Sequence, residues 1–213
     1  MTSTGRSQLR RIEERGSRDS KDIHAILDAA FLAHVGFHQD GQPFVIPMIY
    51  GRQEDTLYLH GSAVSRLLTT LDAGVPACVT VTMIDGLVLA RSAFHHSMNY
   101  RSVVAFGTCK KIPGSSGMTR ALRVISEHVL AGRWQDVRGP TRAELAETTV
   151  VEFRIEEASA KCRQGPPLDE EDDYDRPTWA GLLPLTLTRA LPQPDPRLKA
   201  GIELPSYLMR PDT

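Results

Sequence analysis

Alternating apolar and polar residues predict strands over much of the chain, beginning with a hairpin. Residues 31–38 and 43–50 are rich in strand-forming side chains, and Asp40-Gly41 lies between them. An Asp-Gly pair between two such runs is typical of a tight β-turn, because these residues accept a positive φ. A third strand is expected over 56–60. Pro47 cannot donate to a ladder, so the second strand should be an edge or carry a break.

Helical spacing follows the third strand. Val64, Leu67, Leu68 and Leu71 recur at i, i+3, i+4 and i+7, so a helix is expected after a turn at Gly61. The same reasoning predicts further helices at 21–29, at 117–134 and from Pro140.

The second half of the chain predicts more strands. They are expected over 76–84, from there to about 94, over 103–112 and within 148–161, with Asp85-Gly86 as a second hairpin turn. Hairpins linked by helices favour a small antiparallel β-barrel, because closure removes exposed edges.

Composition narrows the class of protein. The chain has 213 residues, 25 basic and 26 acidic side chains and three cysteines. A balanced charge does not favour a nucleic acid or an anionic membrane as partner. The chain contains no apolar run near the roughly 20 residues of a membrane span and no signal-peptide pattern, so a cytoplasmic protein is expected. The cysteines lack Cys-x-x-Cys spacing, which favours reduced structural thiols over a disulfide or a metal site.

We expect three regions. Residues 1–18 are polar and form a flexible arm, residues 19–164 form the barrel domain, and residues 165–213 form an acidic and proline-rich extension. Within the extension, the acidic run 169–175 is expected to be a solvated loop. The apolar patch that starts at Trp179 should pack on the barrel or on a partner subunit.

One candidate site lies where the third strand meets its helix. It offers backbone N–H groups, two hydroxyls and a guanidinium, a combination that suits a phosphate; its residues are His60, Gly61, Ser62, Ser65 and Arg66. The simpler interpretation is that Ser62 caps the helix and Arg66 is solvated.

Two other groups could complete a site. Between two expected strands lie His95, His96 and a polar cluster, Ser97, Asn99, Tyr100 and Arg101. Adjacent histidines on a strand point to opposite faces, and no acidic or cysteine partner has suitable spacing, so we expect no metal site. The other group is Pro47, Met48, Ile49 and Tyr50, whose interrupted ladder would free backbone groups, unless Met48 and Tyr50 are simply core.

At these residues the sequence resembles the pyridoxamine 5′-phosphate oxidase-like family of flavin-binding split-barrel proteins, in particular the branch with nitroimidazole-resistance proteins. The resemblance covers about residues 19–185. It rests on the order and spacing of four motifs, Val45-Ile46-Pro47-Met48, Tyr58-Leu59-His60-Gly61-Ser62 with Ser65-Arg66, Asn99-Tyr100-Arg101-Ser102-Val103, and Gly165-Pro166-Pro167 ahead of Trp179.

The resemblance implies a six-stranded split barrel, a homodimer, and FMN in a groove between the subunits. Ser65 and Arg66 would hold the phosphate, in a pocket lined by His60, Gly61 and Ser62. The isoalloxazine ring would lie along four residues of the second strand, Pro47, Met48, Ile49 and Tyr50. The site would be completed, from the partner subunit, by Ser97, Asn99, Tyr100 and Arg101, with Trp179 as a lid.

Two departures argue against a vitamin-salvage oxidase. Leu67 stands where those enzymes have a lysine, and the end of the chain, residues 204–211, lacks their basic aromatic segment. Three functions remain open. The first is an FMN-dependent oxidoreductase acting on a small organic substrate, the second is a non-catalytic flavin- or haem-binding or sensing protein, and the third is a cofactor-free dimeric module.

Overall fold

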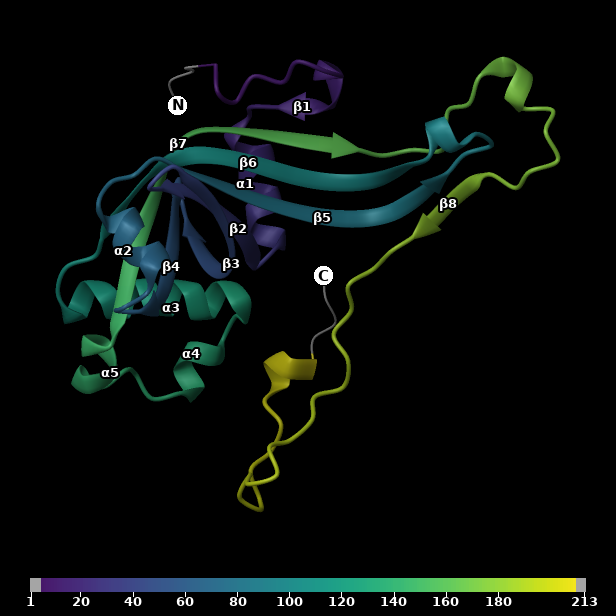
Figure 1. Cartoon of the computed structure of the whole chain (residues 1–213). Coiled ribbons are helices and arrows are strands. Elements are labelled where there is room, and N and C mark those ends of the chain that lie inside the picture. The colour runs from purple at the N-terminus through teal and green to yellow at the C-terminus, as the bar shows by residue number, and fades with distance from the viewer. Residues whose placement is uncertain (1–4, 210–213) are drawn as a thin grey trace.

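Six antiparallel strands form a split β-barrel, as the sequence predicted (Figure 1). The computed structural model describes residues 5–209. Each of the six strands pairs with two others, in the order β4-β3-β2-β5-β6-β7, and β7 pairs again with β4. The strands are β2 (Leu32–Gln39), β3 (Gln42–Gln53), β4 (Thr56–Ser62), β5 (Ala77–Leu89), β6 (Ser97–Lys111) and β7 (Thr148–Arg163).

The barrel has two weak seams. β2 pairs with β5 over only three residues, His34 to Gly36, and β3 pairs with β4 only from Tyr50 to Gln53. Within the described part of the chain, residues 42–49 of β3 therefore have a strand neighbour on one side alone, β2. The expectation that Pro47 lies on an edge is confirmed.

The barrel interior is the main core. Inward-facing side chains alternate with outward ones on every strand, and α1 (Ser20–Ala29) and α2 (Arg66–Asp72) pack apolar faces against them. Asp19 caps α1 by accepting from the Lys21 N–H at 2.8 Å. The fully buried side chains include Ile23, Leu27, Val35, Leu57, Leu59, Leu71 and Phe153.

Helices cover the outer face of β3 and β4. α3 (Ser115–Val129) packs on these strands, and α4 (Arg133–Asp136) and α5 (Arg142–Ala146) follow it. A predicted helix over 117–134 is therefore two helices, separated where Gly132 adopts φ 91°. A capping box between Thr141 and Glu144 starts α5, where the sequence predicted a short helix.

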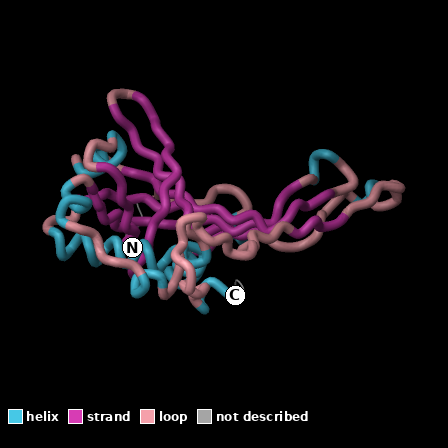
Figure 2. Tube along the Cα trace, turned by 90° about the horizontal axis from the view of Figure 1, so that it is seen from below, coloured by secondary structure: helices cyan, strands magenta, loops and turns pink. Residues whose placement is uncertain are grey.

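β5 and β6 continue beyond the barrel as an arm, joined at its edge by β8 (Gly181–Pro184) (Figures 1 and 2). The hairpin predicted at Asp85-Gly86 is wrong, because β5 runs through these residues with a β-bulge. The Asp85 carboxylate accepts from Arg101 Nε and Nη2 at 3.0 and 2.7 Å. A Cβ on Gly86 would come within 3.0 Å of the Leu183 carbonyl. Asp85 and Gly86 are therefore explained by contacts with Arg101 and β8, and not by a hairpin turn.

Two further boundaries differ from the predictions. β6 begins at Ser97 and not at Val103, so most of the polar cluster is strand. Val64 lies outside α2 and is exposed, because Ser65 is the N-cap.

Segments near both ends of the described residues contact the body. β1 (Gly16–Ser17) pairs with β7, and the Ser7 hydroxyl donates to buried Glu157 at 3.3 Å. Near the other end, Tyr207 donates to the Asp136 carboxylate at 2.6 Å. Short 3₁₀ segments occur at 13–15, 93–95, 171–173 and 206–209. Of the helices in residues 5–209, none is both long and apolar enough to cross a membrane.

The contact between β3 and α3 makes a stability prediction. A Cβ on Gly51 would lie 2.6 Å from the Ile125 backbone, so Gly51→Ala should force the helix off the strand and lower the free energy of unfolding by about 1–3 kcal/mol. Urea unfolding measures the change. Gly139→Ala is the matched control, since no atom lies within 4 Å of its Cβ position. Equal stability of the two variants would contradict this packing.

Candidate functional site

The structure brings together two of the three groups chosen from the sequence, the start of α2 and the open edge of β3. The contact between them is made by Arg66, whose guanidinium carbon lies 4.4 Å from the centre of the Phe44 ring. Phe44 in turn stacks on Phe37 of β2 at 5.3 Å. Phe44 was not among the residues selected from the sequence. Phe44 alternates with Ile46 and Met48, and this alternation could have indicated that Phe44 faces the same side of the strand as they do.

Arg66 is an exposed cation with its charge available. Within residues 5–209, no carboxylate lies within ion-pair distance of its guanidinium, and its contact with Phe44 leaves the N–H donors free for an anion. Ser65 precedes it with extended backbone and no side-chain capping bond. Ser62 does not cap α2, because its hydroxyl only reaches the Val64 N–H at 3.4 Å. Since α2 has seven residues, the guanidinium contributes more to anion binding here than a helix dipole would.

The open edge of β3 directs backbone polar groups toward the same region. The Tyr50 N–H donates to the Phe31 carbonyl at 3.3 Å, so in this antiparallel pair the even-numbered residues bond to β2. The backbone groups of Val45, Pro47 and Ile49 therefore point to the open edge. The missing N–H of Pro47 costs the β2 ladder nothing. The side chains of Val45 and Ile49 are 67% and 44% exposed, so the strand offers apolar surface beside polar backbone.

Tyr50 and Met48 belong to the core. Tyr50 is fully buried, its hydroxyl donates to the Leu27 carbonyl, and its ring lies 4.8 Å from that of His128. Burial raises the pKa of its phenol. Met48 is half-buried against the barrel core. The Tyr50 N–H and hydroxyl are both bonded within the body, which favours the alternative that its side chain is core, and a role for its backbone along a ring stays a prediction.

His60 faces away from the α2 leucines. It follows Tyr58 on one face of β4, whereas Leu57 and Leu59 fill the other, and Gly61 leaves room for Leu68. The His60 Nδ1 is buried with no hydrogen-bond partner within the described chain, and burial lowers the pKa of the imidazole.

The third group lies on the arm, and its polar side chains are largely engaged. Asn99 is buried and accepts from Arg163, which also donates to the Gly165 and Pro166 carbonyls at 3.1 Å. Burial lowers the pKa of Arg163. Arg101 is held by Asp85. Ser97 and Tyr100 lie on β6, exposed and half-buried respectively.

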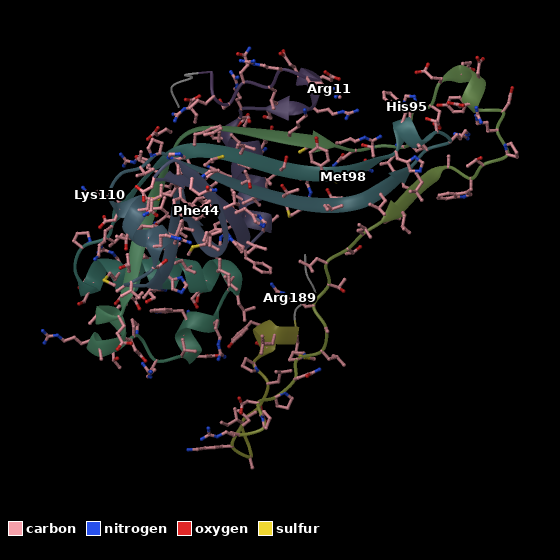
Figure 3. The ribbon with its side chains drawn as sticks, viewed as in Figure 1. Arg11, Phe44, His95, Met98, Lys110 and Arg189 are labelled. Carbon is pink, nitrogen blue, oxygen red and sulfur yellow. The ribbon has the colours of Figure 1, made fainter. Side chains whose placement is uncertain are left out.

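Trp179 also belongs to the arm. Its ring packs on Gly181 at the start of β8, where a Cβ would meet it at 2.9 Å. Figure 1 shows the arm leading away from α2, and Figure 3 shows Met98 on the arm and Phe44 in the body. In a single chain the predicted site is therefore divided between body and arm.

The acidic run contains one buried carboxylate that the sequence did not predict. Asp169 was expected in a solvated loop, yet its side chain is completely buried and accepts from the Arg91 N–H at 2.9 Å. Burial raises the pKa of this carboxyl, but the hydrogen bonds from Arg91 and Ser92 outweigh it and lower the pKa below its ordinary value. Nothing in the sequence distinguishes Asp169 from its acidic neighbours.

These features agree with the family assignment. The family model described as pyridoxamine 5′-phosphate oxidase matches residues 19–162, and the chain belongs to this family. None of the curated proteins matches it.

Two solved structures are similar over nearly their whole length. A flavocytochrome from Azotobacter vinelandii is 37% identical, with 97% of this chain and 96% of that chain covered and a TM-score of 0.90. A protein of Mycobacterium smegmatis described as binding FAD and haem is 35% identical, with 92% and 96% covered and a TM-score of 0.87. A putative 5-nitroimidazole resistance protein of Bacteroides thetaiotaomicron, 24% identical over 68% of this chain and 85% of its own, shares the fold with a TM-score of 0.58.

His60 gives a pH prediction. Its pKa in the folded state lies below the ordinary 6.5, so the unfolded chain binds more protons near and below that pH. Its contribution to stability should be complete above pH 6.5 and be lost as the pH falls toward the folded pKa. His60→Gln should therefore flatten the fall in unfolding free energy on acidification, measured by urea unfolding. His34→Gln, at an exposed position, is the control and should keep the wild-type slope.

Proposed function

We propose that the chain is a flavin- and haem-binding oxidoreductase that works as a homodimer in the cytoplasm and takes electrons from a small organic substrate. The observation that carries the flavin half is the exposed Arg66 guanidinium on Phe44, beside the open edge of β3. A cation without a carboxylate partner suits a phosphate, and the adjacent edge offers an apolar strand with directed backbone groups for a planar ring.

The flavin is inferred to be FAD. FMN, which the sequence resemblance implied, and FAD share the isoalloxazine ring and the first phosphate, so Arg66 and the β3 edge would meet the same groups in either. Similarity at 35% identity to a protein described as binding FAD supports the larger cofactor. Mass analysis of the cofactor released by heat distinguishes the two.

Haem binding is supported by how much of the chain the two similar structures cover. The family model ends at residue 162, whereas the two relatives described as a flavocytochrome and as an FAD- and haem-binding protein cover 97% and 92% of the chain. The relatives thus share most of the chain outside the family match, a region that contains β8 and the extension. We infer that this added region serves the second cofactor.

A flavin exchanges one or two electrons and a haem exchanges one, so the pair suits transfer from a two-electron donor to a one-electron acceptor. The chain's own part is to bind and orient: Arg66 fixes the phosphate end, β3 fixes the ring edge, and apolar side chains exclude water. A non-catalytic sensor on this scaffold would hold the same cofactors without rapid reduction. Stopped-flow mixing with a nicotinamide donor separates the two functions.

Arg66 tests the flavin site. Arg66→Ala should weaken flavin binding about 10- to 100-fold, because a charge-assisted bond to phosphate is lost, while Arg66→Lys should lose less. Fluorescence titration of the cofactor-stripped protein with FAD measures this. Arg123→Ala removes another exposed arginine, on α3, and should bind FAD as the wild type does. Unchanged affinity in Arg66→Ala would refute the site.

The arm supports the dimer. Ile84 lies opposite Tyr100 of β6, on a part of the arm nearer the barrel than Leu87 and Met98, and its side chain is exposed in the single chain. Burying this part of the arm against a second copy would bring an arm to the partner's β3 and α2, which reunites the divided site. The arrangement explains why the arm residues are remote from Arg66 in one chain.

Ile84 tests the dimer. The wild type should sediment at twice the 23.6 kDa of one chain, and Ile84→Glu should shift it toward the monomer, because a charge would be buried at the interface. Val137→Glu, at an exposed apolar position before α5, is the control and should stay dimeric. A monomeric wild type at micromolar concentration would contradict the proposal.

A further inference from the structure

The end of the arm is a built structure. The buried Asp169 carboxylate accepts from the Arg91 N–H at 2.9 Å, from Arg91 Nη1 at 3.1 Å and from the Ser92 N–H at 3.4 Å. The Arg91 guanidinium also lies 4.7 Å from the centre of the Tyr174 ring. The Ser92 hydroxyl is buried without a partner in the described chain. These contacts fix the backbone of Ser92, including its carbonyl group.

The Ser92 carbonyl orients His96. His96 Nδ1 lies 2.8 Å from this oxygen. A carbonyl oxygen can only accept, so Nδ1 must carry the hydrogen, and in the neutral imidazole the lone pair is then on Nε2. A histidine whose Nδ1 donates to a backbone carbonyl is the usual arrangement around a metal-binding imidazole, because the bond fixes the tautomer and the ring. His96 is exposed, so Nε2 is accessible.

The other histidines lack this combination. His24 and His95 direct Nε2 to carboxylates, at 2.8 and 3.5 Å, and His128 is bonded to the Ala30 carbonyl with its ring against buried Tyr50. His60 is largely buried in the body. His34 and His38 lie on β2, and no side-chain hydrogen bond orients either of them within residues 5–209. Of the described histidines, only His96 is both exposed and fixed by a carbonyl at Nδ1.

Apolar surface adjoins His96. Met98, Leu87 and Leu183 lie directly opposite one another on β6, β5 and β8, and they are 37%, 38% and 50% exposed. Phe94, two residues before His96, is almost fully exposed, with its ring edge-on to that of His95. Figure 3 shows His95 at the outer end of the arm and Met98 farther back along it. A flat apolar row beside an imidazole suits a haem macrocycle better than a bare metal ion, and residues 5–209 contain no cluster of three or more ligating side chains.

The geometry points to His96 as an axial ligand of the haem iron, bound through Nε2, with the macrocycle against the row formed by Met98, Leu87 and Leu183. This inference rests on the haem half of the proposed function and adds the residue and the place. The bond is a donation of the Nε2 lone pair to iron and needs no redox step. Asp169 and Ser92 are positioning residues, because they act on the ring through the Ser92 carbonyl.

The test is a haemin titration of the full-length, flavin-loaded protein, followed by absorption in the Soret region. The wild type should bind one haem per chain. His96→Ala should bind haemin at least about 10-fold more weakly, and added imidazole should restore the wild-type Soret position by occupying the vacated volume. His96→Cys should bind haemin with a shifted Soret band, because a thiolate replaces the imidazole.

Controls separate ligation from structure. His95→Ala removes the neighbouring imidazole, which faces Glu170, and should titrate as the wild type does. Retained flavin absorbance and an unchanged sedimentation coefficient show that each variant is folded.

Each remaining outcome decides the matter. A wild type that binds flavin but no haemin overturns the haem half of the proposed function, and the ligand assignment with it. A wild type that binds haemin while His96→Ala keeps the same affinity and spectrum overturns the ligand assignment alone. Loss of haemin binding in His95→Ala but not in His96→Ala would transfer the ligand to the neighbouring residue.

Discussion

The candidate site depends on the point where β3 and β4 separate. Their pairing ends at Tyr50 and Leu59, so residues 42–49 of β3 and 60–62 of β4 are not paired with each other. Beyond these residues β4 stays with β7, while β3 stays with β2. Tyr50 fixes the point of separation, since its N–H donates to the Phe31 carbonyl just before β2 and its buried hydroxyl donates to the Leu27 carbonyl in α1. The chain that leaves β4 enters α2 and returns Arg66 to the exposed side of β3 at Phe44. A cation and an open strand edge meet because the ladder stops there.

The arm differs from the barrel, whose apolar side chains are buried. In the arm, polar side chains bond the strands together and apolar side chains are exposed. Asp85 and Arg101 join β5 to β6 at the bulge, and Arg163 clamps the turn that follows β7. Such a rigid extension with an exposed apolar face makes little sense in isolation, because water would meet that face on every chain. In the proposed homodimer a second copy would cover this face, and the rigidity would then set how far the tip of the arm lies from the proposed flavin site of the partner.

The sequence predicted features that local chemistry determines. The turn at Asp40-Gly41, the edge position of Pro47 and the alternation in β7 all follow from conformational preferences of a few adjacent residues. Asp85-Gly86 carries the same turn signal, but its partners are Arg101 and β8, which are distant in sequence. The candidate residues at Arg66 and the β3 edge were found for the same local reasons. For Tyr50 the sequence left two roles open, ring contact or core, because only the register shows which way a strand residue faces.

Asp169 is a residue whose burial could not be predicted from composition. The six residues after it are five acids and one tyrosine, all exposed or partly buried, and a run of acids is normally solvated. One member is completely buried because Arg91 and two backbone N–H groups satisfy it, at a cost that burial of a charge always carries. The bonds from Asp169 hold the backbone at Arg91 and Ser92 in place, and the Ser92 carbonyl in turn orients His96.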